Sequence, residues 1–416
     1  MYSSFWKRPY NNNSSPICKH WETSNKQMTK RIAIIVQRYG EEVNGGAELH
    51  ARWLAEQLTS LAEVHAITTC AIDYTTWADE YPAGDSVLNG VIVHRFPVDQ
   101  ARKWGDSQRK TGHLLLREHS LFEEMTWMKE QGPYSSALLA FIQESAAVFD
   151  AFIFFTYLYA TTYFGLPLVA EKAILVPTAH DEPFLYMPLF RSLFHLPRLI
   201  AFNTEPEREL VQRVTGNGRV QSTIAGIGIN VPDNPSATAF RNQFGITDPF
   251  LLYVGRIHPA KNVAELIDDF LAFRQVYDQP LKLVLAGKSH IDLPQHPDIV
   301  PIGFVSEQEK FNAIQAAEVV LMPSKYESLS MIVLEAWLMG KPVLVNGRCQ
   351  VLRYQCQQSN GGLYYNTTTE FIATLQKLLQ SPNLRAQLGE QGRKFTQARY
   401  HWNVILSKYQ TILNNI

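Results

Sequence analysis

The chain has 416 residues, of which 46% are hydrophobic and 19% are charged, ordinary values for a globular protein that exclude a fibrous or disordered one. This length exceeds what one hydrophobic core usually supports, so we expect two domains. The 38 basic and 39 acidic residues give a net charge of −1. Because this composition provides no overall positive field, we expect no nucleic-acid partner.

The first 29 residues are polar and slightly basic, without the apolar run that a secretory signal requires. We therefore expect a mobile tail over residues 1–29 and a cytoplasmic protein, with Met28 as an alternative start. The four cysteines are scattered and lack any C-x-x-C pair, which predicts free thiols. They are Cys18, Cys70, Cys349 and Cys356.

Short apolar runs rich in β-branched and aromatic residues alternate with helical patterns along the chain. In the first half these runs occupy residues 32–36, 63–68, 91–96, 152–155, 174–177 and 199–203. Turn-forming residues dominate positions 230–237, and the apolar runs then resume at residues 250–256, 281–287, 298–304, 319–324 and 341–346. The alternation predicts an α/β protein with two Rossmann-like domains, whose parallel sheets face a central cleft.

We place the first domain at residues 30–232, the second at 233–395 and a C-terminal helix at 396–416, which is free to pack back on the first domain. Residues 151–170 carry no charge and are long enough to cross a bilayer. Three threonines, three tyrosines and the break at Gly165-Leu166-Pro167 favour a buried strand followed by a short helix. No transmembrane span is therefore expected.

A glycine pair, Gly45-Gly46, follows the first apolar run and precedes a helical pattern that continues to Leu61. Glycine lets a ligand approach the backbone closely, and the free amides at the start of a helix suit a diphosphate. A plain tight turn explains the pair equally well. The surrounding residues do not fit G-x-G-x-x-G, which disfavours a dehydrogenase.

Two cations and two carboxylates are the candidate functional residues of the second domain. Arg256 and Lys261 follow a predicted strand, where they can offset the charge that grows on a departing pyrophosphate; a solvated loop pair is the alternative. Glu327 precedes a predicted helix. Glu335 lies eight residues later among apolar neighbours, so we expect its carboxylate to have a fixed partner, such as sugar hydroxyls.

Two serines compete for the start of that helix. Ser328 or Ser330 is the candidate N-cap, and either choice aims the backbone amides near Leu329 and Ser330 at phosphate.

Three motifs follow one another along the chain: the glycine pair, a Gly-Arg dipeptide with a lysine five residues after the arginine, and E-x7-E. Their order resembles that of the retaining GT-B glycosyltransferases of family 4, also called glycosyl transferases group 1. The resemblance covers the chain from Lys30 onward. It implies that Glu327 contacts the transferred sugar and Glu335 the nucleotide ribose. It further implies that Arg256 and Lys261 bind the diphosphate, with a backbone amide from Gly46.

The same resemblance implies that Phe304 and Val305 line the nucleotide base. Many relatives carry E-G-F-G where this chain has Glu327-Ser328-Leu329-Ser330. The loop therefore lacks the glycines that allow close approach to a donor.

Candidate residues of the first domain lie beyond its fifth apolar run and in a basic segment. His180 and Asp181 are expected at the cleft, where the resemblance implies that the histidine contacts the donor sugar; a core histidine bonded to structure is the alternative. Asp181, Arg109 and Lys110 are the candidate acceptor-side residues, and the two cations would suit a lipid-phosphate or acidic-sugar acceptor. They belong to a basic cluster with Arg102, Lys103 and Arg117, for which a solvated loop followed by a helix is the favoured alternative.

The chain has no D-x-D motif and no cluster of His, Cys and carboxylates at metal-ligand spacing. We therefore expect no metal and no cofactor, only a nucleoside-diphosphate sugar as co-substrate. The predicted function is metal-independent, retaining transfer of a sugar to a carbohydrate, lipid-linked or small-molecule acceptor, with contact to the inner membrane face left open. The alternatives are a GT-B-shaped nucleotide-sugar epimerase and a non-catalytic nucleotide-sugar-binding protein.

Overall fold

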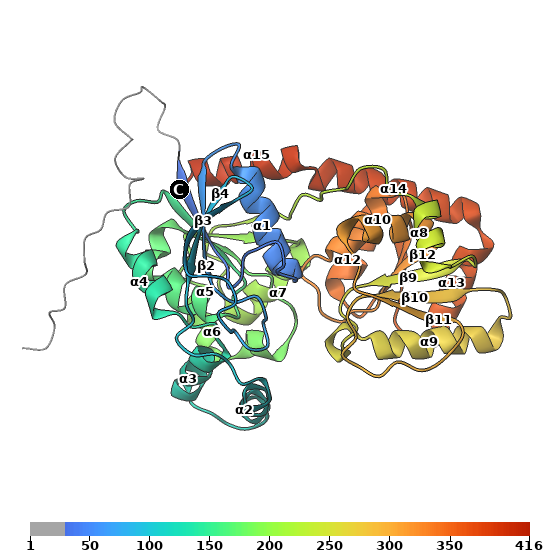
Figure 1. The fold of residues 1–416 in the computed structure, drawn as a ribbon, viewed down its shortest axis with the longest axis horizontal. Coiled ribbons are helices and arrows are strands. Elements are labelled where there is room, and N and C mark those ends of the chain that lie inside the picture. Colours follow the sequence, from blue (N-terminus) through green and yellow to red (C-terminus); the bar gives the residue numbers. More distant parts are fainter. Residues whose placement is uncertain (1–29) are drawn as a thin grey trace, which may run out of the picture.

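The computed structural model describes residues 30–416, so the expectations for residues 1–29, with Cys18 and Met28, lie outside the described residues. The described chain forms two lobes side by side, each built on one sheet with helices on both faces (Figure 1). Both sheets consist of short buried runs of β-branched and aromatic residues, which suit strands covered on both faces.

The first sheet has eight strands: β1 (Arg31–Ile35), β2 (Glu63–Thr69), β3 (Gly84–Leu88), β4 (Val91–Phe96), β5 (Ala151–Phe155), β6 (Ala173–Val176), β7 (Leu199–Phe202) and β8 (Ser222–Ile224). Their order is β3-β4-β2-β1-β5-β6-β7-β8, and only the β3–β4 pair is antiparallel. The helices of this domain are α1 (Gly46–Leu58), α2 (Trp104–Leu116), α3 (Leu121–Gln131), α4 (Ser136–Glu144), α5 (Ala160–Gly165), η2 (Leu166–Lys172), η3 (Pro183–Tyr186), α6 (Pro188–Leu193) and α7 (Glu205–Thr215).

The second sheet is parallel throughout, in the order β11-β10-β9-β12-β13-β14. Its strands are β9 (Phe250–Val254), β10 (Lys282–Ala286), β11 (Ile299–Gly303), β12 (Val319–Met322), β13 (Val343–Asn346) and β14 (Gly362–Tyr365). The helices are α8 (Ala237–Phe244), η4 (Pro259–Lys261), α9 (Val263–Val276), α10 (Glu307–Ala316), α11 (Met331–Leu338), α12 (Gln350–Ser359), α13 (Thr368–Gln380), α14 (Pro382–Tyr400) and α15 (Trp402–Asn414). Two facing α/β domains of this kind confirm the predicted fold class.

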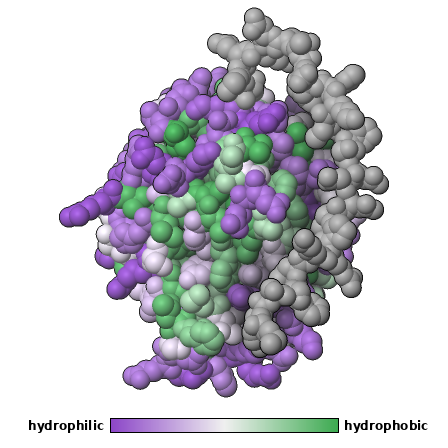
Figure 2. Space-filling model, turned by 90° about the vertical axis from the view of Figure 1, so that its left-hand side faces the viewer, coloured by the Kyte–Doolittle hydropathy of each residue, from purple (hydrophilic) through white to green (hydrophobic). Residues whose placement is uncertain are grey.

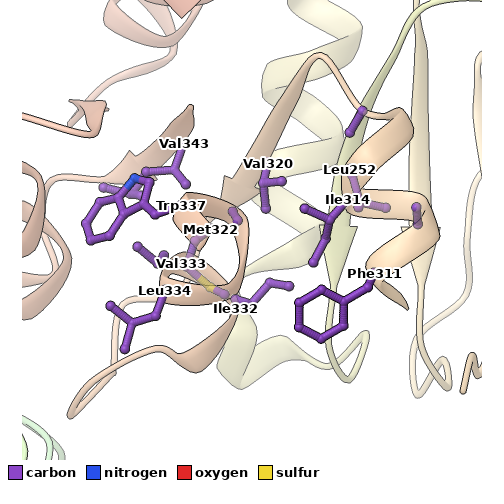
Figure 3. Close-up of a cluster of buried hydrophobic side chains, with 14 of the residues drawn as sticks. Leu252, Phe311, Ile314, Val320, Met322, Ile332, Val333, Leu334, Trp337 and Val343 are labelled. Carbon is purple, nitrogen blue, oxygen red and sulfur yellow. The ribbon is translucent and has the colours of Figure 1, made fainter. Parts of the chain in front are cut away.

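Clusters of buried apolar side chains cover both faces of each sheet. Figure 3 shows one of them, in which Trp337 and Val333 of α11 lie near Met322 of β12, with Phe311 of α10 nearby. This core fixes the position of α11 on the sheet, and with it the loop that precedes the helix.

The last helix returns to the first domain. Figure 1 shows α14 over the second lobe and α15 crossing to the first. Ile405, Tyr409, Ile412 and Leu413 of α15 are buried in the same cluster as the side chains of β1. The two domains are therefore joined twice, by the segment after β8 and by the α14–α15 junction.

Three strands were not anticipated from the sequence. β3 is an edge strand whose first four residues are exposed, β8 has three residues that are only partly buried, and β14 begins at a glycine and is half exposed in its middle. None of them therefore gives a long apolar run. The first helix ends at Leu58 and does not reach Leu61, which is 36% exposed beyond the helix.

Within residues 30–416, no helix has the length and apolar character that a bilayer crossing needs. Figure 2 views the end of the first domain remote from the second and shows hydrophobic residues in an irregular band between hydrophilic margins. The uncharged run at residues 151–170 forms buried β5 followed by α5 and the start of η2, as the sequence predicted.

Candidate active site between the two domains

The segments after β6, β9 and β12 bring three candidate side chains together from both domains. The Lys261 Nζ lies 2.7 Å from Glu327 Oε1, and the two side chains are 29% and 11% exposed. His180 comes from the other domain, and its Nδ1 lies 3.3 Å from Glu182 Oε1. Burial opposes protonation of His180, but the hydrogen bond to Glu182 and the negative charges of Glu182 and Glu327 outweigh it and raise the pKa of His180.

Backbone strain marks the start of the His180 loop. Thr156 and Thr178, immediately after β5 and two residues after β6, have φ angles of 66° and 50°, which β-branched residues rarely adopt. Each such conformation costs about 1–3 kcal/mol and tends to occur at ligand sites. The Thr178 hydroxyl lies 3.2 Å from the Thr156 hydroxyl, so the two strained positions support each other.

The Glu207 carboxylate binds backbone amides just beyond the ends of the neighbouring strands β6 and β7. Its Oε1 accepts the backbone N–H of Ala179 and its Oε2 that of Asn203, both at 2.6 Å. The side chain is buried, and burial raises its pKa to about 7 although the amides favour the charged form. Because Ala179 precedes His180, this carboxylate helps to position the histidine.

The loop that carries Glu327 is attached to the first domain. The Thr204 hydroxyl donates to the carbonyl of Ser328 at 3.0 Å, and the Asn203 amide donates to the Ser328 hydroxyl at 3.3 Å. Ser328, one of the two serines that replace glycines of the related motif, therefore contributes to the contact between the domains.

The expectation of a serine N-cap for α11 is confirmed for the residue, Ser330, and wrong for its side chain. Ser330 occupies the N-cap position, but its φ is 68° and its hydroxyl makes no capping hydrogen bond. The buried Ser330 Oγ has no partner within the described residues. The backbone N–H groups of Leu329 and Ser330 likewise donate no hydrogen bond to any acceptor within residues 30–416. Three donors therefore remain available at the start of this helix.

The fixed partner expected for Glu335 is a protein side chain. Lys310 Nζ donates to Glu335 Oε1 at 2.8 Å and also to both oxygens of Glu307. Sequence reasoning missed Lys310, because its spacing from Glu307 suggests an ordinary pair on a helix surface.

The glycine pair does begin a helix, and its conformation requires glycine. Gly45 has a φ of 156°, and a Cβ there would lie 2.1 Å from Glu48 Oε2. The helix start is not an empty anion site, since the Glu48 carboxylate lies beside it. Arg38 and Gln37 donate to that carboxylate, at 3.1 Å and 2.9 Å, and the arginine balances its charge.

Arg256 reaches towards the first domain. Its guanidinium carbon lies 5.3 Å from the centre of the Tyr74 ring, and that of Arg38 lies 5.6 Å from the same ring. The cation–π contact holds the head group of Arg256 near the cleft without neutralising it, whereas the charge of Arg38 is already balanced by Glu48. Neither Arg38 nor Tyr74 belongs to the motifs from which the sequence prediction started.

The remaining candidates are more peripheral. Phe304 is 68% exposed beyond β11, and Val305 packs partly on the second-domain core. Asp181 is exposed and accepts the Tyr186 hydroxyl at 2.6 Å.

The basic cluster divides into different environments. Arg109 pairs with Asp106 and Lys110 with Glu130, all of them well exposed. Arg102 is not solvated as the favoured alternative supposed. It is buried, donates to the carbonyls of Thr75 and Gln131, and stacks on Trp77 and Trp104. Its role is structural.

The described residues contain no group of three or more His, Cys, Asp or Glu side chains that could hold a metal ion. Cys70, Cys349 and Cys356 are buried and form no disulfide with one another in the described part of the chain.

Comparison with solved structures identifies the arrangement as the GT-B fold. Sucrose-phosphate synthase from Thermosynechococcus elongatus matches 93% of this chain and 98% of its own, with a TM-score of 0.69 and 17% identity. HepE of Anabaena, solved in complex with UDP-glucose, matches 93% and 100% of the two chains, with a TM-score of 0.67 and 14% identity.

Sequence comparison finds a family match within the second domain. Residues 236–395 match the family Glycosyl transferases group 1. Alpha-D-kanosaminyltransferase of Streptomyces kanamyceticus is 27% identical over 179 residues, which cover 38% of this chain and 44% of that protein. The chain spans less than half the length of the first curated relatives it matches.

Proposed function

We propose that the protein is a retaining glycosyltransferase that uses a nucleoside-diphosphate sugar. The observation that carries the proposal is the Lys261–Glu327 pair at 2.7 Å, with His180 of the other domain within electrostatic reach. The match of residues 236–395 to Glycosyl transferases group 1 supports it. Because structural neighbours were solved with UDP and UDP-glucose, UDP is the first nucleotide to test.

In the proposed reaction, Lys261 and Arg256 offset the charge that develops on the departing diphosphate, and the free donors at the start of α11 bind its oxygens. The bond between the anomeric carbon and the phosphate oxygen breaks as the acceptor oxygen attacks from the same face. The departing phosphate oxygen takes the acceptor's proton. Glu327 holds hydroxyls of the transferred sugar, and His180 contacts that sugar from the first domain.

Removal of either cation tests this assignment. We expect Arg256→Ala and Lys261→Ala to lower turnover by about 100- to 1,000-fold, as expected when one electrostatic contact to a developing charge is lost. Lys394→Ala is the matched control, since the Lys394 side chain is 73% exposed on α14. Turnover within twofold of wild type for both cleft variants would reject the proposal for these residues.

We also propose that transfer needs no metal ion. The cations and helix donors near Glu327 support this, because they can neutralise a diphosphate without Mg²⁺. Transfer should continue unchanged in EDTA. Activity that disappears with EDTA and returns with Mg²⁺ or Mn²⁺ would overturn this part of the proposal.

The proposed acceptor is a carbohydrate or a lipid-linked molecule met in the cytoplasm at the inner membrane face. Support for membrane contact comes from the apolar tip, which we define as Leu116 at the end of α2 with Leu121, Phe122 and Met125 at the start of α3. Leu116 is 88% and Phe122 77% exposed. These helices project from the first lobe (Figure 1). Phosphatidylglycerol vesicles should carry the wild type, but not Phe122→Glu, to the top of a density gradient.

Val87→Glu is the control for that experiment, because Val87 is 71% exposed on the edge strand β3. A wild-type protein that stays at the bottom of the gradient would reject membrane contact without affecting the proposed chemistry.

Two other functions are distinguished by incubation with the donor alone. An epimerase would convert the donor to another nucleotide sugar without an acceptor. A non-catalytic binding protein would leave it intact with or without acceptor. The charged groups gathered at Glu327, namely Lys261 and His180, favour a catalyst over a binding protein.

A further inference from the structure

We propose that Lys310 is a positioning residue that keeps Glu335 ionised and oriented, so that the site selects nucleotides with a complete ribose. The inference rests on the proposed function, in which Glu335 binds the ribose. It concerns a different residue, on a different helix, from those that the sequence motifs identify.

The geometry places one ammonium group between an inner and an outer carboxylate. Lys310 Nζ lies 2.8 Å from Glu335 Oε1 and 2.9 Å and 2.8 Å from the oxygens of Glu307. Lys310 is 8% exposed and Glu335 is 2% exposed, whereas the Glu307 side chain is 52% exposed. The Lys310 ammonium group therefore bridges the exposed carboxylate of Glu307 and the buried carboxylate of Glu335.

An unpaired carboxylate at this depth would be costly to ionise. Burial raises the pKa of Glu335, and the charge and hydrogen bond of Lys310 act in the opposite direction. Burial also opposes the charge on Lys310, but Glu335 and Glu307 outweigh it and raise the pKa of the lysine. Lys310 thus remains an ammonium group and favours the carboxylate form of its partner.

The protonation state of Glu335 decides what it can recognise. A carboxylate only accepts hydrogen bonds, and ribose hydroxyls can donate them. Lys310 takes Oε1 of Glu335, and Oε2 receives no hydrogen bond within the described residues. A nucleotide without the hydroxyl that donates to Glu335 Oε2 would leave this buried charge without a hydrogen bond. The resulting cost lowers the affinity of the site for such a deoxynucleotide.

The experiment compares UDP with its 2′-deoxy and 3′-deoxy forms by isothermal titration at pH 6 to 8.5. The variants are Lys310→Met, Lys310→Arg and, as the matched control, Glu307→Gln. We expect wild type to disfavour at least one deoxynucleotide by roughly 10- to 100-fold, the range for a hydrogen bond to a charged group. Lys310→Met should lose most of that preference and bind UDP about 10-fold more weakly.

The pH profile separates positioning from simple packing. In Lys310→Met the pKa of Glu335 rises further, so UDP affinity should increase as pH rises and the carboxylate forms. Lys310→Arg and Glu307→Gln should keep the ribose preference and a flat profile. The double variant Lys310→Met/Glu335→Gln removes both charges, so it tests the inference if the single variant unfolds. It should match Glu335→Gln in affinity and show no pH dependence.

The outcomes distinguish this inference from the proposed function. Wild-type ribose preference in Lys310→Met, or a double variant that binds UDP more weakly than Glu335→Gln alone, overturns the role of Lys310. A wild type that binds UDP and both deoxy forms equally overturns the ribose role of Glu335, and the inference with it. No binding of UDP, ADP or GDP by wild type overturns the proposed function itself.

Discussion

Ser330 combines a strained backbone with an unpartnered hydroxyl, two costs at one residue. Its φ of 68° suits glycine better than serine, and its Oγ is buried without a partner in the described chain. A residue that is costly in the unliganded protein is best explained by a contact made with ligand. The hydroxyl and the adjacent backbone amides are suited to a phosphate oxygen.

Substitution of Ser330 should therefore separate stability from affinity. Ser330→Gly should raise the free energy of unfolding by about 1 kcal/mol by relieving strain, yet weaken UDP binding by roughly 10-fold. Ser330→Ala should keep the strain and show the same loss of binding. Denaturant unfolding and titration with UDP measure the two effects. Wild-type affinity in Ser330→Ala would show that the hydroxyl does not contact the nucleotide.

Substitutions of Glu335 and Glu327 should also have different effects on UDP affinity and turnover. Glu335→Gln should weaken binding of both UDP and the intact donor, because both contain the ribose, at a cost of about 1.5–3 kcal/mol. Glu327→Gln should leave UDP binding nearly intact and lower turnover, since its proposed partner is the transferred sugar, which UDP lacks. Titration with UDP and turnover with full donor measure both. Equal loss of UDP affinity in the two variants contradicts this division.

Residue types and their order could be predicted from the sequence, but side-chain pairings could not. The approach of Lys261 to Glu327 spans 66 positions and depends on how β9 and β12 lie in the sheet. The motifs identified both residues, but the distance required the fold. Lys310, Glu207 and Arg38 act through partners on other segments, so no local pattern distinguishes them from ordinary charged residues.

At the scale of elements, Glu207 links the ends of β6 and β7 through two short hydrogen bonds to backbone amides. Glutamine has only one side-chain oxygen acceptor, so Glu207→Gln must leave one of these amides without its bond. The variant should loosen the His180 loop and lower turnover more than it lowers UDP affinity. Titration with UDP alongside turnover measures this, and equal losses would contradict a role confined to the first domain.

The same carboxylate predicts a dependence of stability on pH. Its pKa is about 7 in the folded protein and near 4.5 when unfolded, so the folded state binds more protons between these values. Wild type should therefore lose stability as pH rises from about 4.5 to 7, by up to about 3 kcal/mol. The stability of wild type relative to Glu207→Gln, measured by denaturant at pH 5 and 7.5, should fall accordingly. An unchanged difference would show that Glu207 does not titrate in this range.

Strands were predictable where both faces of the sheet are covered. β1, β5 and β9 are nearly uninterrupted apolar runs because helices cover them on each side. The edge strand β3 reads GDSVL and is mostly exposed. Its strand conformation comes from pairing with β4, which the sequence of the strand itself does not indicate.

At the scale of the whole molecule, the two connections between the domains contact each other. Trp402, at the start of α15, donates from Nε1 to Asn230 Oδ1 at 2.6 Å. A Cβ at Gly228 would lie 2.3 Å from the nearest carbon of the Trp402 ring. The relative position of the domains thus depends on a glycine that leaves room for an indole, a requirement that neither segment reveals alone.

Gly228→Ala should therefore disturb the arrangement of the domains and spare each domain's own site. The proposed nucleotide contacts, Lys261, Ser330 and Glu335, all lie in the second domain, whereas His180 lies in the first. We expect turnover to fall at least 10-fold, because displacement of a reacting group by about 1 Å is enough for such losses, while UDP affinity stays within twofold of wild type.

Gly218→Ala is the matched control, since a Cβ there would meet no heavy atom within 4 Å. It should leave turnover unchanged and add about 0.4–1 kcal/mol of stability by restricting the unfolded chain. Wild-type turnover in Gly228→Ala would show that the contact between the connections does not set the geometry of the site, and a parallel loss of UDP affinity would place the damage within the second domain.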